Sequence, residues 1–315
     1  MNLVVNNLFL GLSLLCTAVS GTPPHFVHQP AMALQAAPSP ASHPSFRVRV
    51  VGHGQPLLLL AGLGCSDAVW DATVARYSKK YQCHVVSLAG FAGNAPIAGL
   101  PIASARQELL AYVQQQQLPK LIVVGHSLGG FLALALAAEA PAHFSQVVVL
   151  DALPFGAAAA QPQLTEEQVR QASPTPTALG QQFAALPPAQ FAQLQRQLLA
   201  PAVADTARLR QLLAERQQSD PTTLGRAMAE MMQTDLRPRL PRLTMPVLVL
   251  GCDATARLMK PGATATECRQ FYAAQYAGTP RLTLAMSPTA RHFLQYDAPA
   301  WYFQQLDKVL VHKSV

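Results

Sequence analysis

The stretch that decides the fold is LIVVGHSLGGF, residues 121–131. Its first four residues are apolar and three of them are β-branched, which is typical of a strand buried on both faces. Residues 125–129 then fit the pattern G-x-S-x-G, and the Ala- and Leu-rich residues 131–140 predict a helix that ends at Pro141. A strand that turns this sharply into a helix strains its central residue and leaves no room for a Cβ on the flanking glycines. The turn therefore lifts the Ser127 hydroxyl out of the sheet, beside a helix N-terminus that favours negative charge.

The segments around this stretch alternate strands with helices. Residues 46–51, 56–60, 83–88 and 146–150 are predicted strands, and residues 67–77 and 103–117 are predicted helices. Further strands follow at residues 246–250 and 281–285, and residues 298–310 form a closing helix. Strands and helices at this spacing predict an α/β fold with a largely parallel sheet.

One long insertion interrupts this alternation. From Leu153 to Arg239 the sequence contains no credible strand, and short stretches rich in Gln, Ala and Leu are separated by prolines. The apolar spacing in residues 183–199 and 209–232 predicts packed amphipathic helices rather than a disordered insert.

The strand, the G-x-S-x-G turn and the helix together resemble the nucleophile turn of the α/β-hydrolase superfamily. The resemblance covers roughly residues 46–312 and implies an α/β-hydrolase fold: a mostly parallel central sheet with flanking helices and a helical cap inserted after the strand that ends at Asp151. It divides the chain into a core of residues 45–152 and 241–315 and a cap of residues 153–240.

The N-terminus differs in kind from the rest of the chain. Residues 8–19 are apolar but too few to span a bilayer comfortably, and small residues precede a cut after Ser20, although residues 1–7 contain no Lys or Arg. We therefore expect residues 1–20 to be a signal peptide and residues 21–44, rich in Pro, Ala and Ser, to be a flexible tether. The mature protein is then exported, periplasmic or secreted, without a stable membrane span. An uncleaved N-terminal membrane anchor is the alternative.

Composition narrows the range of partners. The 315 residues are 50% hydrophobic and 12% charged with a net charge of +7, so a large core is easily built. The Lys and Arg residues are scattered along the chain, which argues against a nucleic-acid partner. Cys and His show no spacing typical of a metal site, and no complete nucleotide-binding motif is present, so we expect no metal and no cofactor.

The cysteines are expected to be buried thiols. Four remain after the predicted cleavage, and a core of this size does not need a disulfide. Export nevertheless permits one, and Cys252 with Cys268 is the pair to test first.

Ser127 needs a base, because a serine hydroxyl is a poor nucleophile near neutral pH. His292 follows the last predicted strand and precedes the closing helix. The superfamily places its histidine at this position, and the order of serine before histidine agrees.

Two aspartates compete to orient this histidine. The superfamily usually carries its acid after the strand that here is residues 247–250, three residues beyond the glycine, but that position is Ala254. Asp253 stands one residue earlier, before a predicted loop at residues 254–262. Asp151 instead ends the strand expected beside the nucleophile strand, where some members carry the acid. We lean slightly to Asp151 and leave both open. Weaker candidates are Asp235 and Asp297.

Two backbone amides are expected to stabilise the oxyanion, each by ~3 kcal/mol in the transition state. One belongs to Leu128. The other belongs to Leu63, because the superfamily's His-Gly-x-Gly turn corresponds here to residues 61–64, Ala-Gly-Leu-Gly. Phe91, on the loop after the next strand, either lines the substrate pocket or packs in the core.

These residues predict a serine hydrolase that cleaves a carboxylic ester or related acyl bond of a small-molecule substrate through an acyl-enzyme on Ser127. An aminopeptidase or amidase of the same fold is one alternative, although the cap acids Glu166, Glu167 and Glu215 form no evident site for a substrate amine. A catalytically inactive hydrolase fold that serves as a binding protein is the other, because the acid is ambiguous.

Overall fold

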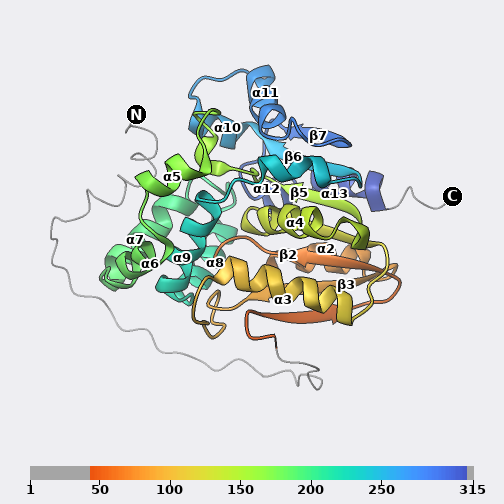
Figure 1. Ribbon diagram of the computed structural model, residues 1–315, viewed down its shortest axis with the longest axis horizontal. Coiled ribbons are helices and arrows are strands. Elements are labelled where there is room, and N and C mark those ends of the chain that lie inside the picture. The colour runs from red at the N-terminus through yellow and green to blue at the C-terminus, as the bar shows by residue number, and fades with distance from the viewer. Residues whose placement is uncertain (1–42, 311–315) are drawn as a thin grey trace.

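The central sheet contains seven strands in the order β1-β3-β2-β4-β5-β6-β7 in the computed structural model, which describes residues 43–310 (Figure 1). β1 runs antiparallel to β3, and all the other neighbouring strands are parallel. The mostly parallel α/β sheet expected from the sequence is confirmed. The strands are β1 Phe46–Val51, β2 Gln55–Leu60, β3 Tyr81–Leu88, β4 Leu121–His126, β5 Phe144–Leu150, β6 Val247–Cys252 and β7 Leu282–Ser287.

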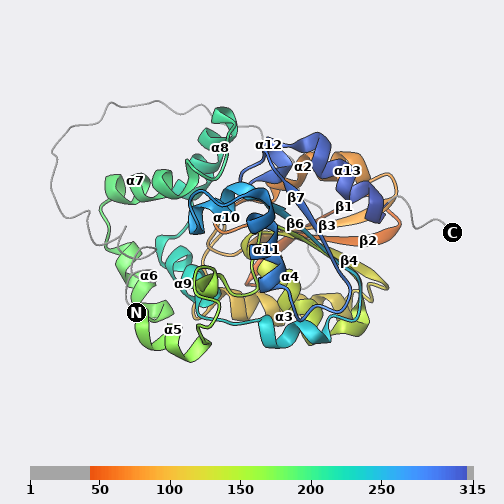
Figure 2. The same ribbon diagram turned by 90° about the horizontal axis from the view of Figure 1, so that it is seen from above.

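Helices cover both faces of the sheet (Figure 2). Alternate residues of each central strand therefore face two different cores: Leu58 and Leu60 of β2 pack on one side, and Leu57 and Leu59 on the other. This explains why the strands read as continuous apolar runs. The first core includes residues of α3 Pro101–Gln115, α4 Leu128–Glu139 and α11 Ala265–Gln275, and the second those of α2 Asp71–Tyr77, α12 Leu294–Asp297 and α13 Pro299–Leu310.

The insertion forms a group of helices beside the sheet, at the end where β4 and β5 finish (Figure 1). Its helical character is confirmed, whereas the limits of a separate cap domain stay a prediction. Its α-helices are α5 Glu166–Ala172, α6 Pro176–Ala184, α7 Pro188–Leu199, α8 Thr206–Gln217 and α9 Pro221–Met232. Four short 3-10 helices complete residues 43–310: η1 Asp67–Trp70, η2 Pro141–His143, η3 Gly156–Ala158 and η4 Arg237–Arg242.

One local prediction was wrong. The predicted loop at residues 254–262 is largely helix α10, Asp253–Met259, which follows β6 directly. Residues 183–199 belong to two helices separated at Pro187, as the prolines of the insertion predict, because α6 ends at Ala184 and α7 begins at Pro188. A proline lacks the amide hydrogen that a continuous helix needs, and it restricts the residue before it.

All four cysteines of the described residues are buried free thiols, and the pair Cys252 and Cys268 forms no disulfide. Burial raises the pKa of these thiols, that of Cys83 to about 11. The core is large enough to be stable without a covalent link.

The predicted signal peptide, residues 1–20, and the tether as far as residue 42 lie outside the described residues and stay predictions. Within residues 43–310, no helix is long and apolar enough to cross a bilayer.

Glu230 of α9 links the insertion to the core. Its buried carboxylate accepts hydrogen bonds from the backbone N–H groups of Ile102 and Ala103, both at 3.0 Å, in the first turn of α3. The residue before α3, Leu100, has no side chain that caps the helix. Burial raises the pKa of Glu230, and the two amides act in the opposite direction. The insertion thus supplies the acceptor that the first turn of α3 lacks.

Replacing Glu230 with Ala is expected to lower the free energy of unfolding by about 1–3 kcal/mol, because it leaves two buried amides without an acceptor. Chemical denaturation of the full chain measures this change. Glu167→Ala is the control: Glu167 is exposed on α5, and its loss should change the free energy by no more than about 0.5 kcal/mol. Equal effects of the two substitutions would contradict the proposed link.

Candidate active site

Ser127 occupies a strained turn between β4 and α4. Its φ of 54° lies in the left-handed region, and its N–H donates to the Leu150 carbonyl at 2.9 Å. A Cβ on Gly125 would lie 2.1 Å from the Gly129 carbonyl oxygen, and a Cβ on Gly129 would lie 2.1 Å from that of Leu60. The packing therefore requires both glycines of the motif, and it holds the half-buried serine where the sequence predicts.

His292 and Asp151 meet beside this turn. His292 Nδ1 lies 2.6 Å from Asp151 Oδ2, and since an ionised carboxylate only accepts, the nitrogen donates. His292 Nε2 is then the unprotonated nitrogen that can accept a proton. The His292 side chain is 27% exposed and that of Asp151 is fully buried. Both residues line a pocket of about 150 Å³ that Ser127 also lines.

Asp151 is held by several donors besides His292. Thr255 of α10 donates to Oδ2 at 2.6 Å, and the Tyr272 hydroxyl of α11 donates to Oδ1. Cys252 Sγ lies 3.5 Å from Oδ2. Burial and the nearby Asp151 charge raise the pKa of Tyr272 well above its usual value, so the phenol keeps its proton and remains a donor. These bonds compensate for the loss of solvent around a buried carboxylate.

The other aspartate candidates have different partners. Asp253 is buried in the first turn of α10, where its carboxylate pairs with Arg257 at 3.2 Å. It does not line the pocket that Ser127 lines. The structure thus brings Asp151, rather than Asp253, to the histidine. Asp235 pairs with Arg237, and Asp297 accepts backbone N–H groups of Ala204 and Arg291.

The loop after β2 lies against the nucleophile turn. A Cβ on Gly62 would lie 3.3 Å from Ser127 Cβ, so the backbone just before Leu63 runs beside the serine. Leu128 begins α4, where first-turn amides have no acceptor within the helix. The contribution of these two amides to an oxyanion site stays a prediction.

Phe91 packs in the core. It is 1% exposed, and it is absent from the described residues that line the pocket. Phe131 and Met231 line the pocket with Ser127 instead, and the sequence analysis missed them. The spacing of Phe131, one helical turn after Ser127, is a signal that identifies it. Met231 lies in the insertion, and the sequence around it carries no comparable signal.

His126, which occupies the first x position of the G-x-S-x-G motif, was also missed by the sequence analysis. Its side chain is fully buried, and its Nε2 donates to the backbone carbonyl of His292 at 3.0 Å. Burial, and then the neighbouring His292, lower the pKa of His126 well below its usual value. A neutral His126 therefore fixes the loop that carries His292 and takes no proton itself in the neutral range.

The described part of the chain, residues 43–310, contains no group of three or more His, Cys, Asp or Glu side chains arranged to hold a metal ion. The chemistry that the described side chains support is nucleophilic attack by a serine with an imidazole as base.

Comparison with known proteins gives related sequences and folds. The profile of the alpha/beta hydrolase family matches residues 57–305. A pimeloyl-[acyl-carrier protein] methyl ester esterase of Vibrio vulnificus (strain YJ016) is 32% identical over 204 residues, which cover 63% of this chain and 75% of that protein. The corresponding esterase of Aliivibrio salmonicida is 29% identical over 62% of this chain and 72% of its own length.

Solved structures share the fold at lower identity. A thermophilic esterase from Thermogutta terrifontis superposes with a TM-score of 0.66 at 17% identity, covering 84% of this chain and 93% of its own. The enol-lactonase from Burkholderia xenovorans LB400 superposes with a TM-score of 0.64 at 15% identity, covering 85% of this chain and 96% of its own.

Asp151→Asn is expected to lower kcat for ester hydrolysis by ~10⁴, because the amide would hold His292 in the wrong tautomer. Asp253→Asn is the matched control and should retain kcat within a few-fold. Steady-state kinetics on both purified variants, with thermal melts to verify folding, measure the difference. If Asp253→Asn is the inactive variant, Asp151 is not the acid.

Tyr272→Phe should lower kcat roughly 10- to 100-fold with little change in KM, since a hydrogen bond to a charged group worth about 1.5–3 kcal/mol is lost. Tyr276→Phe is a close control. Tyr276 caps the C-terminal end of α11, four residues after Tyr272, and is similarly buried, but its hydroxyl donates to the Ala152 backbone carbonyl at 2.8 Å. Both variants lose a buried hydrogen bond, so equal losses of kcat would mean that Tyr272 has only a structural role.

Proposed function

The chain belongs to the alpha/beta hydrolase family and is a serine esterase of that fold, and from this premise we propose that it hydrolyses its ester through an acyl-enzyme on Ser127. The observation that carries the proposal is the 2.6 Å hydrogen bond between His292 and the buried Asp151, beside a serine in a strained turn.

In the proposed mechanism, His292 Nε2 takes the proton of the Ser127 hydroxyl as Oγ attacks the ester carbonyl. The amides of Leu63 and Leu128 bind the resulting oxyanion. The imidazolium, stabilised by Asp151, then gives its proton to the departing alcohol. A water molecule, activated by the same imidazole, attacks the acyl-enzyme and releases the acid.

We propose that the substrate is an acyl ester with a small alcohol such as methanol. The relatives named pimeloyl-[acyl-carrier protein] methyl ester esterases support this class. The narrow pocket of about 150 Å³ at Ser127 also supports a small group beside the histidine.

The pocket offers little to an amidase that would bind a substrate amine. Asp151 is the one carboxylate among its described lining residues, and its oxygens already accept bonds from four side chains. We also propose that the mature chain is exported. This proposal is based only on the apolar residues 8–19.

Ser127→Ala should abolish turnover of methyl esters apart from a residual rate from binding and the oxyanion site. A fluorophosphonate probe should label the native protein at Ser127 and fail to label the variant. Ser104→Ala, a half-buried serine of α3, should keep both the activity and the labelling. Retention of more than about a tenth of kcat by Ser127→Ala excludes it as the nucleophile. Faster turnover of amino-acid anilides than of esters would favour the amidase alternative.

A further inference from the structure

A second and larger cavity lies between the insertion and the core. Its volume is about 530 Å³, against about 150 Å³ for the pocket at Ser127. Small-molecule sites commonly measure roughly 300–1,000 Å³, so this cavity has the size of a substrate site, whereas the pocket at Ser127 is smaller. The first turns of α3, the middle of α4, α5, the N-terminus of α6 and the end of α9 form its walls. We refer to it as the second chamber.

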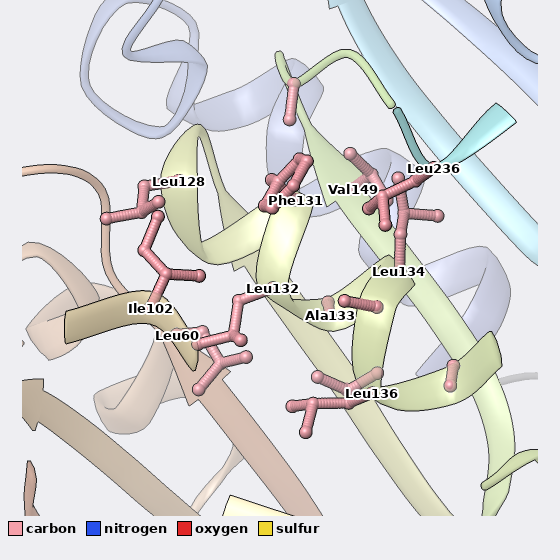
Figure 3. Close-up of a cluster of buried hydrophobic side chains, with 14 of the residues drawn as sticks. Leu60, Ile102, Leu128, Phe131, Leu132, Ala133, Leu134, Leu136, Val149 and Leu236 are labelled. Carbon is pink, nitrogen blue, oxygen red and sulfur yellow. The ribbon is translucent and has the colours of Figure 1, made fainter. Parts of the chain in front are cut away.

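The floor of the second chamber is apolar. Ile102, Phe131, Ala135 and Leu236 line it and are nearly fully buried. Figure 3 shows Ile102, Phe131 and Leu236 gathered around α4. Leu100, which is 42% exposed, adds a large apolar side chain to the lining. Such a surface favours a hydrocarbon group.

Most charged groups of the chamber are already paired within the protein. Glu230 accepts the two amides of α3, Arg106 pairs with Glu139, and Arg170 pairs with Glu166. A ligand there therefore gains mainly by covering the apolar floor, which points to an aliphatic chain rather than an ion.

The second chamber and the pocket at Ser127 share one described lining residue, Phe131. Met231 of α9 lines the pocket at Ser127, whereas Glu230 of α9 and Thr234, two residues after α9 ends, line the chamber. His292 lines the pocket and not the chamber. Because the departing alcohol must leave beside His292, which protonates it, the chamber lies where the other part of an ester, the acyl chain, extends.

We infer that the second chamber binds the distal part of a long aliphatic acyl chain, which reaches it from Ser127 when the Phe131 ring turns aside. This inference rests on the proposed function, because the substrate has an acyl chain only if it is the proposed acyl ester. It adds a binding site in the insertion, and it makes Phe131 a residue that determines acyl-chain length.

The test compares kcat/KM for p-nitrophenyl acetate and p-nitrophenyl decanoate. Ala135→Phe places a ring in the chamber and should lower decanoate turnover roughly 10- to 100-fold while acetate turnover stays within a few-fold. Phe131→Ala opens the wall and should raise the decanoate-to-acetate ratio by a similar factor. Thr234→Phe fills the chamber from a half-exposed position, and it is the second blocking variant if Ala135→Phe does not fold.

Ala159→Phe is the control, since Ala159 lines a different cavity of about 240 Å³ and its change should leave the ratio unaltered. A wild type that hydrolyses acetate but not decanoate, or blocking variants that keep the wild-type ratio, would overturn the inference and leave the proposed esterase intact.

Calorimetric titration of Ser127→Ala with methyl decanoate separates the two proposals. Binding that Ala135→Phe weakens at least 10-fold supports the chamber even if no ester is hydrolysed, which would refute only the proposed function. Absence of binding, or binding that Ala135→Phe does not weaken, counts against the chamber.

Discussion

The contact between α4 and the end of β2 constrains the whole centre of this molecule. At Gly129 the helix approaches so closely that any Cβ would overlap the carbonyl of Leu60. This approach fixes three features together: the angle at which α4 leaves β4, the position of the serine above the sheet, and the nearness of the loop after β2. The site is thus built on backbone packing between rigid elements, and side chains adjust its chemistry.

The second requirement is a stable buried charge. Asp151 directly follows β5, but the groups that hold it, Thr255 and Tyr272, come from the region after β6. That region is where the superfamily usually carries the acid itself. Here the neighbouring strand end supplies the carboxylate, and the usual position supplies donors to it. Parallel strands whose carboxyl ends meet at one edge make the two arrangements nearly equivalent for the histidine.

The sequence predicted most of the sheet, the strained turn and the histidine, because each has a local cause: apolar runs buried on two faces, glycines without space for a Cβ, and a loop after the last strand. It left the acid open because spacing along the chain does not tell which strand end lies nearest to His292. Helices α10 and α11 were missed: α10 follows β6 with no residue between them, and the capping box of Thr264 and Glu267 that starts α11 was overlooked. Phe131 had a local signal in its helical spacing from Ser127. Met231 and Glu230 act on segments about a hundred residues away, and no local pattern encodes such contacts.

The carboxylate that completes α3 has a consequence for how the chain acquires its structure. Glu230 follows Ile102 by 128 residues. At synthesis rates of about 5–20 residues per second, α3 leaves the ribosome roughly 6–26 s before its acceptor exists. During this interval the first turn of α3 lacks its acceptor and is free to fray. Closure of the fold around this helix therefore waits for the end of the insertion, which couples maturation of the core to synthesis of the segment that covers the site.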